Sequence, residues 1–194
     1  FNEKSKRGTE FLLPYMFISF IPVLLLILFS QEVFIFFPKS YNWGYQILLI
    51  LCIYYAILFI GKINGPQLLF AKKTWLISGL SLANICLNIS FTYPLVLLYG
   101  ATGAAIGTVM SALAIGLITF YYAQKHAYLE WNYKKISFCY LYLILSSCFV
   151  LLLDYEMFSY LINTTIKLFI FIFFILQGQR LGILDFKQVI KLLR

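Results

Sequence analysis

Six long apolar stretches, separated by short polar ones, constrain this chain more than any other feature. They cover residues 11–30, 42–61, 75–98, 101–123, 136–153 and 160–179. A helix needs about 20 apolar residues to cross the hydrocarbon core of a bilayer. Strands of a membrane barrel need about 10 residues and alternate between apolar and polar, and these stretches do not alternate. The sequence therefore predicts an all-α integral membrane protein with about six transmembrane helices.

Composition excludes a soluble protein and argues against several kinds of site. Of the 194 residues, 62% are hydrophobic and only 11% are charged, whereas about a quarter of the residues of a soluble domain carry charge. The net charge of +8 does not indicate nucleic-acid binding, because the basic residues form short clusters between apolar stretches. The cysteines lie within apolar stretches without metal-ligand spacing, and His126 is the only histidine, so no metal or cofactor site is expected.

Lys and Arg are distributed so that 13 of the 15 fall on one side of the predicted helices, in both terminal tails and in the second and fourth loops. The excess of positive charge in cytoplasmic loops predicts that both ends of the chain are cytoplasmic, with an even number of spans. The tail 183–194 alternates apolar and basic residues at helical spacing. It is expected to form a cytoplasmic amphipathic helix on the anionic inner leaflet; the alternative is a partner-binding helix. The polar start at Phe1 lacks the apolar core of a signal peptide, so we expect the C-terminal part of a longer protein.

A row of polar residues follows one face of the third predicted helix. Its members are Ser81, Asn84, Asn88 and Thr92, spaced by three, four and four residues. Amides and hydroxyls do not face lipid without cost, so the row faces water or other helices. Two interpretations follow: the wall of a hydrated substrate pathway, or hydrogen bonds between helices, worth about 0.6 kcal/mol each.

Prolines and small residues predict bends and close helix contacts. Pro14, Pro22 and Pro94 lie within predicted spans, where proline removes a backbone donor and can kink a helix. Gly103, Gly107 and Ser111 recur every four residues, a spacing that lets helix backbones approach closely. A tight, uncharged turn at residues 99–102, which includes Gly100, is expected to join the third and fourth spans.

Lys167 is the one charged residue predicted to lie inside a span. A charge within the membrane is a functional candidate, here for an anionic substrate. Lys167 is also near enough to the outer end for its stem to extend to the headgroups, and this second interpretation is preferred. Intramembrane His, Asp or Glu residues for acid–base chemistry are not evident in the predicted spans, so an enzyme is not expected.

Two runs, GPQLLFAKKTW and ISGLSLANICLNISFTYPLVLLYGATGAAIGTVMS, resemble the late spans of polysaccharide flippases. These belong to the multidrug/oligosaccharidyl-lipid/polysaccharide exporter superfamily. The resemblance rests on a lysine-containing turn (Lys72, Lys73), then Leu87-Asn88, then Tyr99-Gly100, and on the small residues from Gly103 to Thr108. It covers roughly residues 9–125. At Ser30-Gln31-Glu32-Val33 the chain departs from the family, which usually has a glycine followed by an acidic residue and tyrosine.

The resemblance implies the C-terminal part, spans nine to fourteen, of a two-lobed transporter in the bacterial cytoplasmic membrane. Its substrate would be an undecaprenyl-diphosphate-linked oligosaccharide, moved to the outer leaflet by alternating access. The partners implied are this lipid-linked oligosaccharide, membrane lipids and the missing N-terminal half. That half would carry most of the cationic residues for the diphosphate, which leaves Lys167 as the one candidate here. The alternatives are a cation-coupled drug or metabolite exporter of the same superfamily, a membrane glycan polymerase or acyltransferase, and an inactive fragment.

Overall fold

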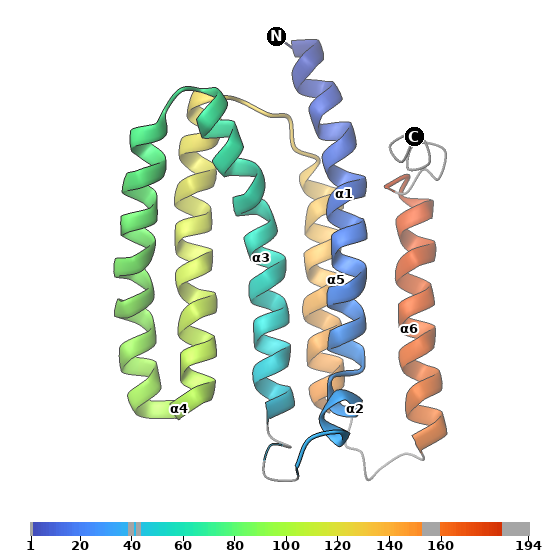
Figure 1. Ribbon diagram of the computed structural model, residues 1–194. Helices are drawn as coiled ribbons and strands as arrows, with labels where there is room; N and C mark the ends of the chain where they lie inside the picture. The colour runs from blue at the N-terminus through green and yellow to red at the C-terminus, as the bar shows by residue number, and fades with distance from the viewer. Residues whose placement is uncertain (1, 39–40, 42–43, 153–159, 184–194) are drawn as a thin grey trace. The chain divides into compact units, whose positions relative to one another are not determined.

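A computed structural model describes residues 2–38, 41, 44–152 and 160–183 of the chain, and all of its regular elements are helices in these ranges (Figure 1). Four helices are long and apolar enough to cross a membrane: α3, Gly44–Phe70; α4, Thr74–His126; α5, Tyr133–Leu152; and α6, from Ile162 to Arg180. The expectation of an all-α protein with the helices of a membrane protein is confirmed at this level. The predicted helix over 183–194 lies, apart from Ile183, outside the described residues.

The chain divides into two compact units. Unit 1 comprises residues 1–45 and 130–194, and unit 2 comprises residues 46–129.

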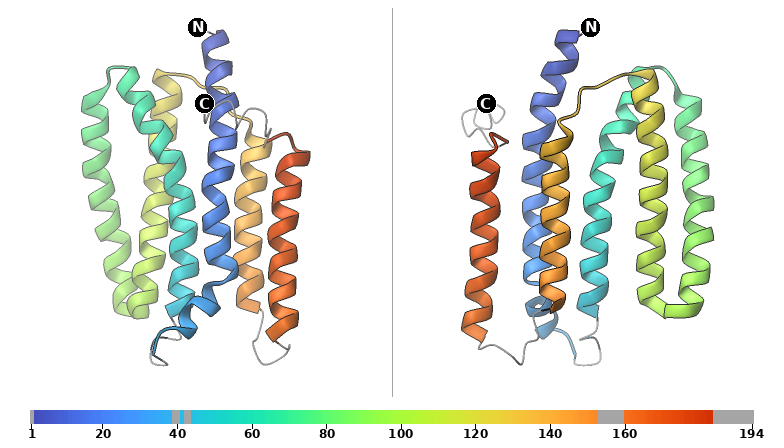
Figure 2. Two further views of the ribbon diagram at one scale, coloured as in Figure 1. Left: turned by 45° about the vertical axis from the view of Figure 1, so that its right-hand side comes forward. Right: turned by 180° about the vertical axis from the view of Figure 1, so that it is seen from behind.

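Unit 1 contains α1 (Asn2–Leu28), the short helix α2 (Ser30–Ile35), α5 and α6 (Tyr160–Arg180). In both views of Figure 2, α1 lies beside α5, and α1 also contacts α6. α1 continues as one helix through Pro14 and Pro22.

Aromatic packing joins the three long helices of unit 1. The ring of Phe17 on α1 stacks on Phe174 of α6 with centroids 4.4 Å apart. Phe20 meets Tyr140 of α5 edge to face at 5.1 Å. The hydroxyl of Tyr142 donates to the carbonyl of Ile170, 2.7 Å away, which links α5 to α6 directly. The aromatic rings therefore fix the level at which residues of each helix face one another.

In unit 2, α3 is longer than the sequence predicts. The predicted span ended at residue 61, and the helix continues beyond it through Pro66 to Phe70. The added turns are held by buried contacts: Leu68 packs with Leu76 and Ala123 of α4. Gln67 Nε2 donates to the carbonyl of Ala123 at 3.3 Å. These contacts outweigh the usual tendency of charge and proline to end a helix.

The turn between α3 and α4 is short and closed by backbone hydrogen bonds. Lys72 has a φ of 55°, and the Lys73 amide donates to the Leu68 carbonyl at 3.1 Å. A residue in the left-handed conformation followed by this six-residue bond is the Schellman ending of a helix. It reverses the chain, so α4 begins antiparallel to α3.

α4 is two helices joined at one residue. Gly100 has φ 59° and ψ −136°, a non-helical conformation between two helical stretches. The two stretches run antiparallel as the arms of a hairpin (Figure 1); we call residues 74–99 the first arm and 101–126 the second arm. The break lies within the range 99–102 where the sequence predicts a turn. The first arm passes through Pro94 without interruption.

Candidate functional site: the α4 hairpin and a buried ion pair

Two of the four predicted row residues face the second arm. Asn88 Nδ2 donates to Ser111 Oγ at 3.0 Å, and Ser111 Oγ donates to the Thr108 carbonyl at 2.9 Å. Thr92 Oγ1 lies 3.5 Å from Asn88 Oδ1. An amide in apolar surroundings needs such partners. The hydrogen bond between Asn88 and Ser111 therefore links the two arms.

The small residues of the second arm lie at the same interface. A Cβ built on Gly107 would lie 2.6 Å from Thr92 Cα, and one on Gly103 would overlap the carbonyl of Leu95. Both glycines are buried, as is Ser111. The absence of side chains at these two positions brings the backbones of the arms close together, which is the geometry expected of small residues spaced by four.

Ser81 and Asn84, the other two row residues, line a hollow of about 190 Å³ between α3 and the two arms. Its other walls are aliphatic side chains and the residues Gly61, Gly65, Gly116 and Thr119. Nothing lies within 4 Å of a Cβ built on any of these three glycines. The Ser81 hydroxyl donates to the carbonyl of Ile77 in its own helix. The polar row therefore divides between a helix contact and an open hollow.

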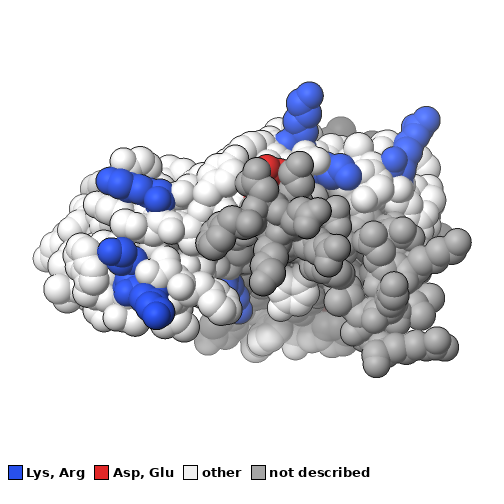
Figure 3. Space-filling model, turned by 90° about the horizontal axis from the view of Figure 1, so that it is seen from above, with Lys and Arg blue, Asp and Glu red and all other residues white. Residues whose placement is uncertain are grey.

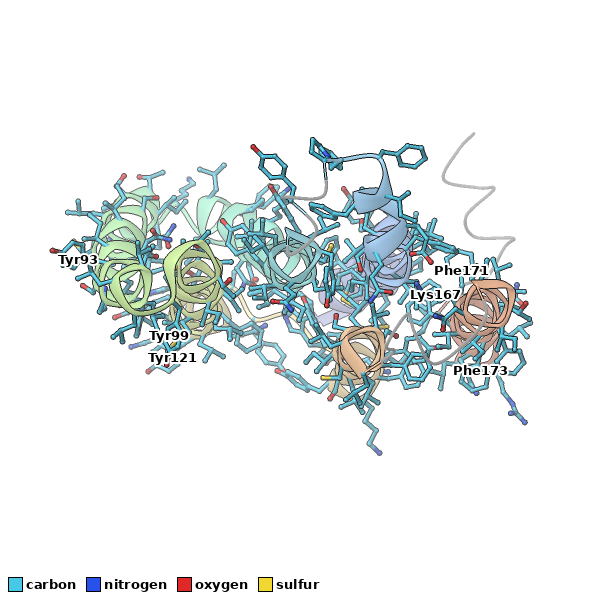
Figure 4. All side chains as sticks on the ribbon, turned by 90° about the horizontal axis from the view of Figure 1, so that it is seen from below. Tyr93, Tyr99, Tyr121, Lys167, Phe171 and Phe173 are labelled. Atoms are coloured by element: carbon cyan, nitrogen blue, oxygen red, sulfur yellow. The ribbon has the colours of Figure 1, made fainter. Side chains whose placement is uncertain are left out.

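Lys167 does not extend to the headgroups, and this interpretation of the sequence is wrong. Its side chain is fully buried, and its Nζ lies 2.6 Å from Glu32 Oε1. Lys167 points from α6 toward α1 and α2 in the view of Figure 4. Glu32 falls between the predicted spans 11–30 and 42–61, whereas in the structure it lies in a helix, α2, with 14% of its side chain exposed. The Glu32 carboxylate neutralises the Lys167 ammonium within the helical unit, so the lysine side chain does not need to extend to the headgroups.

Further polar groups are buried in unit 1 near this ion pair. Asn163 lies one turn before Lys167 on α6 and is 1% exposed. Ser30 on α2 and Ser147 on α5 are also buried. No pattern in the sequence indicated these residues as part of a site. One signal was available, since a lysine within a span requires a counter-charge and Glu32 is adjacent to the first span.

Tyrosines at the surface of the hairpin point away from it. Tyr93, Tyr99 and Tyr121 are labelled in Figure 4, and each is more than 60% exposed. Their rings have an apolar body and a polar tip, which suits the contact between lipid and water.

Within the part of the chain that the structure describes, no group of three His, Cys, Asp or Glu side chains could hold a metal ion. The four cysteines are free thiols.

No family model matches the chain, and neither does any curated protein or solved structure.

Proposed function

We propose that the chain is the C-terminal part of a flippase that moves undecaprenyl-diphosphate-linked oligosaccharides across the bacterial cytoplasmic membrane. Six spans would form one lobe of a two-lobed bundle and its last helix pair, with the hairpin arms counted as two spans. The N-terminal half of the transporter would supply the second lobe and most of the cationic residues for the diphosphate. The oligosaccharide would reach the outer leaflet by alternating access.

The observation that carries the proposal is the hairpin at Gly100. The motif that resembles the flippases spans both arms, from Asn88 through Gly100 to Gly107. Its parts have separate physical roles here: an amide link between the arms, a one-residue turn, and a close backbone contact. An anchor that only holds a protein in the membrane has no need of an internal polar link or of a glycine-lined hollow beside it.

The distribution of charge supports cytoplasmic ends for both units. In unit 2, Lys72 and Lys73 lie in the α3–α4 turn, and Lys125 lies in the last turn of α4, at the opposite end from Gly100. In unit 1, Lys134 and Lys135 open α5, and Arg180 closes α6. Figure 3 looks onto the ends where Lys and Arg gather. Positive charge is retained on the cytoplasmic side of a bacterial membrane.

The hollow would give a substrate pathway both hydrogen-bond donors and hydrogen-bond acceptors. Asn84 is exposed, and its side chain makes no hydrogen bond with any described residue, so its amide is available to a hydroxyl-bearing ligand. Ser81 and Thr119 direct their hydroxyl hydrogens to carbonyls of their own helix, which leaves oxygen lone pairs as acceptors. Sugar hydroxyls both donate and accept, and so match this set.

A second candidate, a cation-coupled exporter of the same superfamily, is favoured by one observation. Such a transporter needs a carboxylate among its helices, and Glu32 is a mostly buried carboxylate on α2, 14% exposed, that the predicted spans did not include. Lys167 already neutralises it, however, so Glu32 offers a coupling ion less attraction than a free carboxylate would.

Deletion of the complete gene tests the proposal. The deletion strain should accumulate lipid-linked repeat units on the inner leaflet, where a glycan-cleaving enzyme added outside spheroplasts cannot reach them. Surface polysaccharide should fall, and the intact gene should restore it. Normal surface polysaccharide in a strain without a second copy would reject the flippase. Increased sensitivity to cationic drugs with normal polysaccharide would instead identify the exporter.

A further inference from the structure

Several buried polar atoms around the Lys167–Glu32 pair have no hydrogen-bond partner among the described residues. They are Ser30 Oγ, Gln31 Oε1, Glu32 Oε2, Ser147 Oγ, and both Nδ2 and Oδ1 of Asn163. Buried polar atoms in folded proteins are nearly always paired with protein or with ordered water. Six unpaired atoms on three helices of one unit therefore indicate a bound species.

Helix geometry brings these atoms to one level. Asn163 and Lys167 are four residues apart, so they share a face of α6, and Lys167 reaches Glu32 on α2. Phe20 of α1 meets Tyr140 of α5. α1 and α5 run parallel (Figure 1), so seven residues further along each helix is the same step of about 10 Å, which places Ser147 level with Ile27, one turn before Ser30. The unpaired atoms thus gather at the α2 end of unit 1.

The charges of Lys167 and Glu32 and the low exposure of the cluster limit what it can bind. Lys167 disfavours a metal cation, and Glu32 disfavours an anion. The unpaired set contains more acceptors than donors, but it has both, so a small neutral molecule that donates and accepts fits it. Ser30, Ser147, Asn163 and Lys167 are at most 3% exposed, so the cluster is closed to bulk solvent and a bound species has to be as small as water. Glu32 is the member of the group in contact with the outside.

We propose that this cluster is a buried hydration site, in which bound water bridges Glu32, Asn163, Ser147 and Ser30 and enters beside the Glu32 carboxylate. A buried water typically makes about three hydrogen bonds, so about two waters satisfy the set. The site extends an aqueous environment into the helical unit and keeps the ion pair solvated. This inference does not rest on the proposed transport function.

Radiolytic hydroxyl-radical labelling of the full chain tests the proposal, because radicals form from bound water and oxidise the nearest thiol. The protein carries Ser147→Cys and retains Cys139, with the other three cysteines replaced by alanine. Cys139 is a matched control: it lies about two turns away on α5, is fully buried, and has no unpaired polar atom of α5 beside it. Mass spectrometry of the two peptides gives the two oxidation rates within one molecule.

The cysteine at position 147 should oxidise at least about tenfold faster than Cys139. Adding Asn163→Leu, which removes the central water ligand and fills its space, should bring that rate down to the rate of Cys139. Equal rates at the two thiols in the first protein would overturn the proposal, whether both were protected or both were oxidised. A fast rate at position 147 that Asn163→Leu leaves unchanged would also overturn it, because the water would not then be held by the cluster.

Discussion

Gly107 should tolerate alanine much less well than Gly116, although both lie on the second arm of α4. A Cβ at Gly107 would sit 2.6 Å from Thr92 Cα and 2.9 Å from Thr92 N, both backbone atoms of the first arm. Nothing lies within 4 Å of a Cβ at Gly116. The two substitutions are chemically identical and differ in what the new methyl group meets.

The magnitude follows from the contact distances. Ordinary van der Waals contact begins at 3.4 Å, so the arms must separate by roughly 0.8 Å at Gly107. Overpacking of this kind costs about 1–3 kcal/mol, and the stretched Asn88–Ser111 hydrogen bond is worth about 0.6 kcal/mol more. Alanine returns about 0.5–1 kcal/mol at either site because it restricts the unfolded backbone. We expect Gly107→Ala to lose about 1–2 kcal/mol and Gly116→Ala to gain slightly.

The free energy of unfolding can be measured by SDS titration in mixed micelles, with helicity followed by circular dichroism. The expected difference between the two variants is about 2–3 kcal/mol. A matched response of both glycines would refute the reasoning, because it would mean that the arms do not approach as closely as the structure shows.

Three further variants test unit 1 and the α4 turn by the same titration. Lys167→Met leaves Glu32 buried without its partner and should cost about 3–5 kcal/mol, most of which the double variant with Glu32→Leu should recover; strictly additive losses would contradict a direct pair. Gly100→Ala should cost about 1–3 kcal/mol, because the conformation at φ 59° is unfavourable for alanine and no neighbour interferes; an unchanged stability would show that the turn does not need glycine. Tyr142→Phe should cost only about 0.6 kcal/mol, the value of one hydrogen bond between helices, and a loss several times larger would mean that the hydroxyl does more than bond Ile170.

The elements that could be predicted from the sequence are those indicated by residues close together in the chain. Apolar length indicated long helices, and the glycine in an uncharged 99–102 segment indicated where the third and fourth predicted spans meet. The end of α3 was missed because Lys62 and Pro66 are ordinary signs of a loop. What carries the helix past them is a packing contact with Ala123, which lies in the second arm of α4. Such a contact is visible only once the chain has folded.

The candidate site was predictable in part for the same reason. Spacing placed Ser81, Asn84, Asn88 and Thr92 on one helical face, but spacing does not say which helix covers each part of that face. Lys167 was recognised as unusual, yet its partner is 135 residues away in sequence. A long-range ion pair leaves no periodic pattern, so its identification required the structure.

The Gly100 turn also bears on how this region enters a membrane during synthesis. Residues 74–124 contain no Asp, Glu, Lys, Arg or His, and a single glycine reverses the chain near their middle. Both arms can therefore leave the ribosome and partition into lipid as one preformed hairpin, with no charge to carry across. With the cytoplasmic ends proposed above, Lys73 and Lys125 at the two ends of the hairpin away from Gly100 stay on the side of synthesis and keep it from inserting in the opposite orientation. One residue without a side chain thus lets two spans be inserted in a single event.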